Sequence, residues 1–131
     1  MRIVCDIPID EDGPRAAKEL LDCLARIWAR RMRRVPMPLL YGSGIRYQLE
    51  PNAGTFEQWK SPIQTFESGW GDCDDLTIYR VAELLARGER GAEAQVLAVT
   101  TPLGVKMHAR VWRGTGVAED PSILLGANPH G

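Results

Sequence analysis

The sequence has few of the residues that build a disulfide framework, a metal centre or a membrane span. Its 131 residues include three cysteines and two histidines, with no CxxC or Cys/His metal-ligand spacing. Three thiols cannot all pair with one another, so we expect reduced cysteines and no metal site. No apolar run approaches the roughly 20 residues that a membrane-spanning helix needs, and the N-terminus lacks the pattern of a signal peptide. These absences predict a protein made in the cytoplasm that uses no cofactor and does not enter a membrane.

Neither positive nor negative charge predominates in the sequence. The formal net charge is −1, with 44% hydrophobic and 25% charged residues, as in an ordinary globular protein. A chain of this length forms a single domain, which we place over residues 1–131. Nothing in the overall charge favours nucleic acid as a partner. One local exception is an arginine run, which is usually a solvated helix end but could contact nucleic acid or an acidic protein: Arg26, Arg30, Arg31, Arg33 and Arg34.

Hydrophobic periodicity predicts two main helices. The first begins at Asp12 or Gly13, before Pro14, and closes in the arginine run because Pro36 cannot continue it. The second runs from about Cys73 to Arg87 and ends at Gly88, a favourable C-terminal residue. The apolar stripe of the first helix is expected at Ala17, Leu20, Leu21, Leu24, Ile27 and Trp28.

The remaining segments read as strands and loops, so the fold class is α+β. The alternation at Arg2–Ile7 suggests a short strand. The segment Pro36–Gly69 combines prolines and glycines with aromatics, as an ordered loop lining a cleft would. Within it we expect a short strand at Ile45–Leu49 and helical turns at Phe56–Trp59 and Ile63–Phe66. After the second helix, three strands form an antiparallel meander: Ala94–Thr100, Val105–Trp112 and Val117–Asp120.

The start of the second helix has the features of a reactive thiol site. Asp72 is a preferred N-cap, and Asp75 completes a capping box, so Cys73 becomes the first helical residue. A thiol there meets the positive end of the helix dipole, which favours the thiolate, and the backbone N–H groups could stabilise an oxyanion. The charges of Asp74 and Asp75 oppose the thiolate, so we expect their side chains to point outward.

A histidine and an aspartate in the meander could complete this site. If the turn is centred on Gly114, His108 faces Asp120 across two antiparallel strands on the same face of the sheet. Asp120 could then orient the imidazole while the other ring nitrogen meets the thiol. A bulge would instead place Glu119 opposite His108, on the wrong face. The other histidine, His130, lies next to the C-terminus.

Each residue also has a purely structural explanation. A lone cysteine in a small domain is often a buried apolar residue, and a strand histidine is often a satisfied structural one. Asp72 is fully explained as a cap. We expect Cys5 and Cys23 to be core residues. The combination of cysteine, histidine and aspartate is what favours chemistry.

The residues around this site resemble the transglutaminase-like superfamily, which is related to papain. The resemblance rests on Gly71–Leu76 (GDCDDL), the leucine-rich helix that follows, His108 on a strand and Asp120–Ser122, and it covers about Gly69–Gly126. Upstream, the chain is similar to short members encoded by tailed bacteriophages and prophages; the residues that carry this likeness are Leu40–Tyr47, Glu50–Pro51 and Glu57–Trp59.

This resemblance implies a fold in which the cysteine-bearing helix packs on a small antiparallel sheet. It implies Cys73 as nucleophile, His108 as general base and Asp120 as the residue that orients the ring. A second oxyanion donor is expected ahead of the cysteine, with Gln64, Trp59 and Trp70 as oxyanion or cleft candidates.

The function we expect is therefore that of a cysteine-dependent amide-bond hydrolase, a peptidase or amidase, with transfer to an amine as another outcome. Its substrate would be a protein, a peptide or peptidoglycan. The alternative is a structural or assembly component of a phage particle, in its tail or head, that keeps the fold without turnover. The protein would then act in the host cytoplasm or within a virion, with phage structural proteins as partners.

Overall fold

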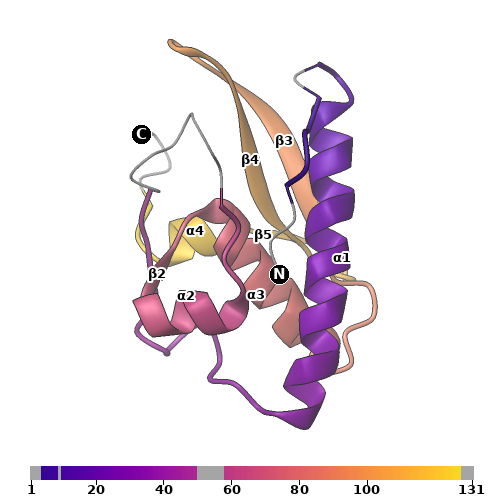
Figure 1. Cartoon of the computed structure of the whole chain (residues 1–131), viewed down its shortest axis with the longest axis vertical. Coiled ribbons are helices and arrows are strands. Elements are labelled where there is room, and N and C mark those ends of the chain that lie inside the picture. The colour runs from indigo at the N-terminus through magenta and orange to yellow at the C-terminus, as the bar shows by residue number, and fades with distance from the viewer. Residues whose placement is uncertain (1–3, 9, 50–57, 128–131) are drawn as a thin grey trace.

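Helices packed against a small antiparallel sheet make up the computed structural model, which describes residues 4–8, 10–49 and 58–127 (Figure 1). The α+β class predicted from the sequence is confirmed. The elements are, in chain order, α1 (Gly13–Arg34), β1 (Arg46–Tyr47), α2 (Pro62–Ser68), β2 (Trp70–Gly71), α3 (Cys73–Ala86), β3 (Glu93–Thr101), β4 (Gly104–Trp112), β5 (Ala118–Glu119) and α4 (Pro121–Leu124).

Helix α1 begins and ends where its sequence predicts. Pro14 occupies the first turn, and the helix stops at Arg34, two residues before Pro36. Its apolar stripe is narrower than expected, because Ile27 is 50% exposed. The fully buried positions recur every three or four residues and are mostly small, so α1 can lie close to α3: Ala17, Leu21, Ala25, Ala29 and Met32.

Helix α3 is the central element, and it packs against both α1 and β4. Unlike α1 it is buried around most of its circumference, including the whole of Tyr79, whose hydroxyl donates to the Pro38 carbonyl at 2.6 Å. The helix ends as predicted, with Gly88 at φ 96°. A helix enclosed in this way fixes the position of its own first residue, Cys73.

Strands β3, β4 and β5 form the antiparallel meander in that order. In the β3–β4 hairpin, Leu97 pairs with His108. In the β4–β5 pair, Val111 faces Glu119 and Trp112 faces Ala118, so this hairpin is centred on Thr115 and not on Gly114. Arg113 N–H donates to the Val117 carbonyl at 2.8 Å, so this pair closes the turn at residues 114–116.

The N-terminal strand predicted at residues 2–7 is wrong over its described part, since residues 4–7 are irregular. The predicted strand at 45–49 is confirmed in shorter form as β1, which pairs in parallel with β2. Helix α2 confirms the helical turn predicted at 63–66. The turn predicted at 56–59 lies partly outside the described residues, and residues 58 and 59 are not helical.

The prediction that Cys5 and Cys23 belong to the core is also wrong, because both thiols are exposed. Cys23 lies beside the apolar stripe of α1 but faces away from α3. No described helix is long and apolar enough to cross a membrane. In the same part of the chain, no group of three or more His, Cys, Asp or Glu side chains could hold a metal ion.

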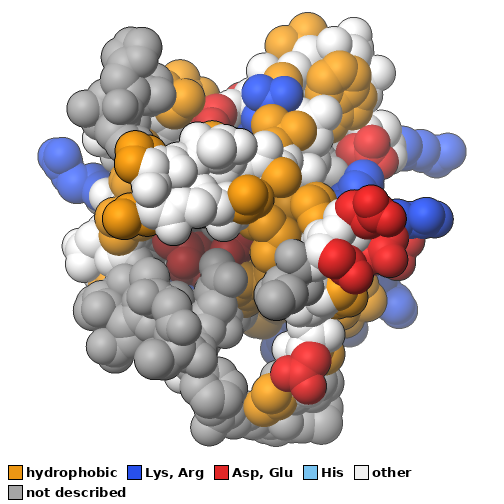
Figure 2. Space-filling model, turned by 90° about the horizontal axis from the view of Figure 1, so that it is seen from above, with side chains coloured by type: hydrophobic (Ala, Val, Ile, Leu, Met, Phe, Trp, Pro, Cys, Tyr) orange, Lys and Arg blue, Asp and Glu red, His pale blue; other side chains and the backbone are white. Residues whose placement is uncertain are grey.

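The β3–β4 hairpin projects from one end of the molecule (Figure 1). Near its tip Val99, Leu103 and Val105 are 43%, 100% and 74% exposed. Seen from that end, hydrophobic side chains lie at the surface, and Asp and Glu side chains group at one side (Figure 2). Exposed apolar side chains on a projecting hairpin are typical of a contact surface.

Candidate active site

The start of α3 has the capping geometry predicted from the sequence. The Asp72 carboxylate accepts from Asp75 N–H at 3.1 Å, and the Asp75 carboxyl accepts from Asp72 N–H at 3.2 Å. Cys73 is therefore the first helical residue, and it is partly buried. Gly71 must be glycine for packing reasons, since an added Cβ would lie 2.9 Å from the Asp75 Cβ. The thiol thus sits at the positive end of a well-capped helix.

The sequence suggested that the side chains of Asp74 and Asp75 point outward, but both residues are buried. Asp75 is held inward because its second oxygen accepts from Lys60 N–H at 2.7 Å. Burial and the nearby charge of Asp72 raise the pKa of Asp75 to about 8. Asp75 is then mostly neutral at pH 7, which removes one of the two charges expected to oppose a thiolate.

This raised pKa predicts a specific dependence of stability on pH. The folded protein holds the Asp75 proton more tightly than the unfolded chain does, so the contribution to stability is complete below pH 4 and is lost as the pH rises towards 8. In Asp75→Asn that loss disappears. Between pH 5 and 8, the free energy of unfolding of the wild type should fall relative to that of the variant by on the order of a few kcal/mol. Urea denaturation at several pH values measures the free energy of unfolding of both proteins, and in their difference the titrations of all other groups cancel. If both free energies changed equally with pH, Asp75 would not have the raised pKa.

His108 and Asp120 form the pair that the sequence predicted. The His108 Nε2 lies 2.6 Å from the Asp120 Oδ2, while the other oxygen of Asp120 accepts from Ser122 N–H at 3.1 Å and from the Ser122 hydroxyl. Burial raises the pKa of Asp120, but the hydrogen bonds from His108 and Ser122 outweigh it and hold the pKa below its usual range. Among the described residues, Nδ1 of His108 has no hydrogen-bond partner. Nδ1 is the nitrogen left to exchange a proton.

This contact forms through a different register from the predicted one. The pairing of Val111 with Glu119, extended by one residue, places Arg110 opposite Asp120. His108 lies two residues further along β4, and a shift of two keeps a side chain on the same face. The Asp120 carboxylate therefore reaches His108 diagonally. The same carboxylate is also held in place because it caps the N-terminus of α4, a helix that the sequence did not predict.

Tyr47, which sequence reasoning did not identify, interacts electrostatically with residues of the site. Tyr47 pairs with Gly71 in the β1–β2 ladder, and its N–H donates to the Leu125 carbonyl at 3.0 Å. Burial raises the pKa of Tyr47, and the negative charges of Cys73, Asp72 and Asp120 raise it further. This phenol is therefore coupled electrostatically to both Cys73 and Asp120. Within the described residues no hydrogen bond joins Cys73 to His108, so a proton transfer between them needs a closer approach than this structure shows.

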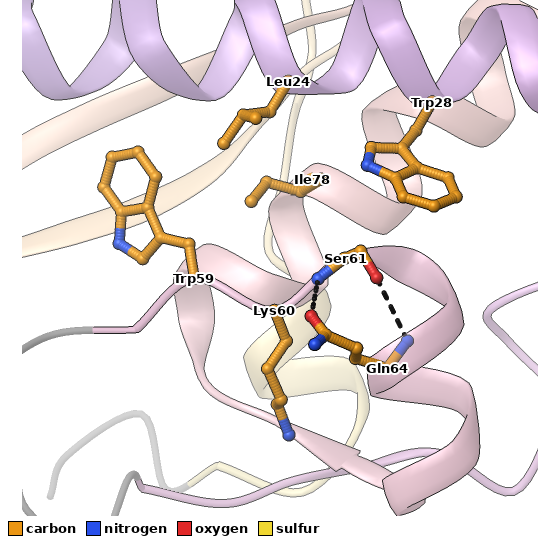
Figure 3. A pocket seen from close by; sticks show the side chains of 7 residues that line it. All are labelled: Leu24, Trp28, Trp59, Lys60, Ser61, Gln64 and Ile78. Carbon is orange, nitrogen blue, oxygen red and sulfur yellow. Dashed lines mark hydrogen bonds between the residues drawn. The ribbon is translucent and has the colours of Figure 1, made fainter. Parts of the chain in front are cut away.

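The three oxyanion or cleft candidates have different surroundings. The Gln64 side chain completes a capping box at the start of α2, where it accepts from Ser61 N–H at 2.9 Å (Figure 3). Trp70 lies under the ammonium group of Lys60, 3.2 Å from the ring centroid. Trp59 packs against the same cluster of buried residues as Cys73. Of the three, Trp59 is the one that shares a buried cluster with Cys73.

Trp59 also lines a cavity of about 110 Å³. Figure 3 shows the indole rings of Trp59 and Trp28 on either side of Leu24 and Ile78. The lining is mainly apolar, with Ser61 and Gln64 of the α2 cap at one edge. A cavity of this size and character could take an aliphatic side chain.

A network of partly buried ion pairs holds β5 against α3, next to Asp120. Glu119 accepts from Arg80 at 2.7 Å, from Arg113 at 2.9 Å and from the Tyr41 hydroxyl at 2.6 Å. Arg80 also pairs with Glu83 of its own helix. Because Asp120 follows Glu119 directly, this network fixes the strand that presents the carboxylate to His108.

Comparisons with known proteins do not assign the chain to a family. No family model matches it, and neither the curated proteins nor the solved structures include a significant match. Its function is therefore argued from the geometry of the site.

Proposed function

We propose that this chain is a cysteine-dependent amide-bond hydrolase with the transglutaminase-like fold. The observation that supports it most is the hydrogen bond between His108 on β4 and Asp120, which follows β5 directly, in the sheet that comes after the helix headed by Cys73. An activated thiol needs a cysteine at a capped helix start, a histidine within reach and an aspartate that orients the histidine, and these three residue types follow in that order here. A peptide or peptidoglycan substrate and a phage or prophage origin belong to the same proposal and rest on sequence resemblance.

In this proposal each residue has one role. Asp120 is ionised and accepts a hydrogen bond from the Nε2–H group of His108. This bond selects the tautomer in which Nδ1 can take a proton. His108 then receives the thiol proton of Cys73 at Nδ1. The backbone N–H groups of the first turn of α3 stabilise the oxyanion, and the Trp59 indole N–H is a second candidate donor.

The reaction would run in two steps. The Cys73 sulfur forms a bond to the amide carbonyl carbon, the C–N bond breaks, and the imidazolium of His108 gives its proton to the leaving amine. Water then attacks the thioester, His108 takes a proton from that water, and the C–S bond breaks. The acid is released and the thiol is restored when His108 returns the proton. An amine in place of water would give transfer.

An activated ester tests the proposal without knowledge of the natural substrate. With p-nitrophenyl acetate, we expect nitrophenolate release and acetylation of Cys73 at least about 10-fold faster than of Cys23, which is exposed and serves as the ordinary thiol in the same molecule. Mass spectrometry of acid-quenched peptides measures each site, and Cys73→Ser should abolish the fast phase. Equal rates at Cys73, Cys23 and Cys5 would refute the activated thiol.

One observation favours a second candidate, an assembly component without turnover. The apolar tip of the β3–β4 hairpin, at Val99, Leu103 and Val105, is exposed and suits a contact with another structural protein. In that case the His108–Asp120 pair has only the structural role of joining β4 to α4. The acylation experiment separates the two candidates, because only the hydrolase requires Cys73 to react faster than the exposed cysteines.

A further inference from the structure

The C-terminal half of α1 presents an uninterrupted row of arginines. Arg26, Arg30, Arg33 and Arg34 follow each other at i, i+4, i+7 and i+8, which places them on one flank of the helix. All four are exposed. The Arg33 guanidinium donates to the Leu85 carbonyl at 3.1 Å, so this flank lies beside the end of α3, where the exposed C-cap residue Arg87 continues the row. We call these residues the arginine patch: Arg26, Arg30, Arg33, Arg34 and Arg87.

The positive charge of the patch is not neutralised by neighbouring acids. The ion pairs of the described residues involve other cations, and no patch arginine belongs to one. No Asp or Glu occurs in the sequence between Asp22 and Glu50. The ends of α1 and α3 each contribute about half a negative charge, which is much less than the patch carries. Since the whole chain has a net charge of −1, the rest of the molecule is acidic and the charge is strongly polarised.

The opposite end of α1 carries the acids. Asp6, Asp10, Glu11 and Asp12 are exposed before and at the start of the helix, at the end of the molecule from which Figure 2 shows a group of acidic side chains. A molecule polarised in this way turns its basic end towards a polyanion as it approaches.

The chemistry of the patch favours phosphate groups. Its cations are all arginines, whose planar guanidinium groups bind phosphate oxygens in pairs. From Arg26 to Arg34 the row extends about 12 Å along the helix axis, a length over which duplex DNA presents about seven phosphate charges. One exposed apolar side chain, Ile27 at 50% exposure, borders this flank, whereas a protein interface would need a larger buried apolar or aromatic centre.

We propose that the arginine patch binds the phosphate backbone of nucleic acid, independently of base sequence. The patch is at the C-terminal end of α3 and Cys73 is at its N-terminal end, which are about 20 Å apart along 14 residues. Binding at the patch is therefore separate from the chemistry proposed for Cys73, and it stands whether or not that chemistry occurs.

The test is the binding of a fluorescein-labelled 30-base-pair duplex to the full chain, followed by anisotropy. Between 50 and 200 mM salt we expect the affinity to fall on the order of 10²-fold, as for about four or five phosphate contacts. Arg30→Gln/Arg34→Gln should weaken binding at least about 10-fold and lower the salt slope by about two. Glutamine is a good helix former, so the fold should be kept, and circular dichroism checks it.

The matched control is Arg15→Gln/Lys106→Gln, which removes the same charge from exposed positions outside the patch. Binding by the control should stay within about twofold of the wild type. The exposed thiol of Cys23 lies on the patch flank, three residues before Arg26, so bound DNA should also slow its alkylation but not that of Cys5. Equal losses in both double variants, or binding of polyglutamate in preference to DNA, would overturn the proposal.

Discussion

Replacement of His108 by glutamine is expected to slow the acetylation of Cys73 by p-nitrophenyl acetate by about 10²–10⁴-fold, the usual contribution of a general base. Glutamine keeps a polar side chain of similar length but cannot accept the thiol proton. The ring is held by Asp120 through Nε2, so the variant removes a proton acceptor that is already oriented. Stopped-flow nitrophenolate release in a Cys5→Ser/Cys23→Ser background measures the effect on Cys73 alone.

The matched control for this variant is Arg110→Gln. Arg110 is two residues from His108 on the same strand, opposite Asp120 in the register, but its guanidinium binds Gln95 on β3 and forms no ion pair with Asp120 among the described residues. It should change the rate by less than about threefold if the effect is specific to the proposed proton transfer. Similar losses in both variants would show that disturbance of β4, not loss of a base, slows the reaction.

Replacement of Glu119 by alanine is expected to lower the free energy of unfolding by about 3–5 kcal/mol, as when one partner of a buried ion pair is removed. The variant leaves the guanidinium of Arg80 with its Glu83 bond but without its Glu119 bond, and it leaves the Tyr41 hydroxyl without its acceptor. The side chains of Arg80 and Glu119 are only 11% and 14% exposed, so water cannot fully replace the lost contacts. Urea denaturation at pH 7 gives the value.

The control for stability is Glu93→Ala. Glu93 pairs with Lys18 at 3.3 Å, but its side chain is 49% exposed, and such pairs contribute about 0–1 kcal/mol. A cost of less than about 1 kcal/mol for Glu119→Ala, similar to the control, would mean that the network does not hold β5 in place. The position of Asp120 would then need another explanation.

Local signals in the sequence predicted the main elements. The proline at the start of α1, the Asp72–Asp75 capping box and Gly88 at the end of α3 each act within a few residues, so they can be recognised without tertiary structure. The alternation of β3 and β4 is equally local. The His108–Asp120 contact was predicted although its register was not, because a shift of two residues along a strand preserves the face.

Features that depend on distant neighbours could not be predicted. Asp75 is buried because the N–H of Lys60, from a separate loop, donates to it. The sequence predicted the strand that contains Tyr47, but it could not predict the parallel pairing of β1 with β2, which depends on tertiary structure. Cys23 borders the apolar stripe that the sequence predicts, but the residues of α1 that are buried lie on the opposite side of the helix, so the thiol faces solvent. The nearness of Arg87 to the arginines of α1 likewise depends on how two helices pack.

Titration of the Cys73 thiolate tests the central claim most directly. In a Cys5→Ser/Cys23→Ser background, the thiolate absorbance at 240 nm reports this thiol alone. If the sulfur and the ring of His108 share a proton at the helix start, the absorbance should develop at a pH well below the range of an ordinary thiol, and His108→Gln should move it upward by at least one pH unit. A titration at or above the ordinary range, unchanged by the His108 variant, would contradict the account.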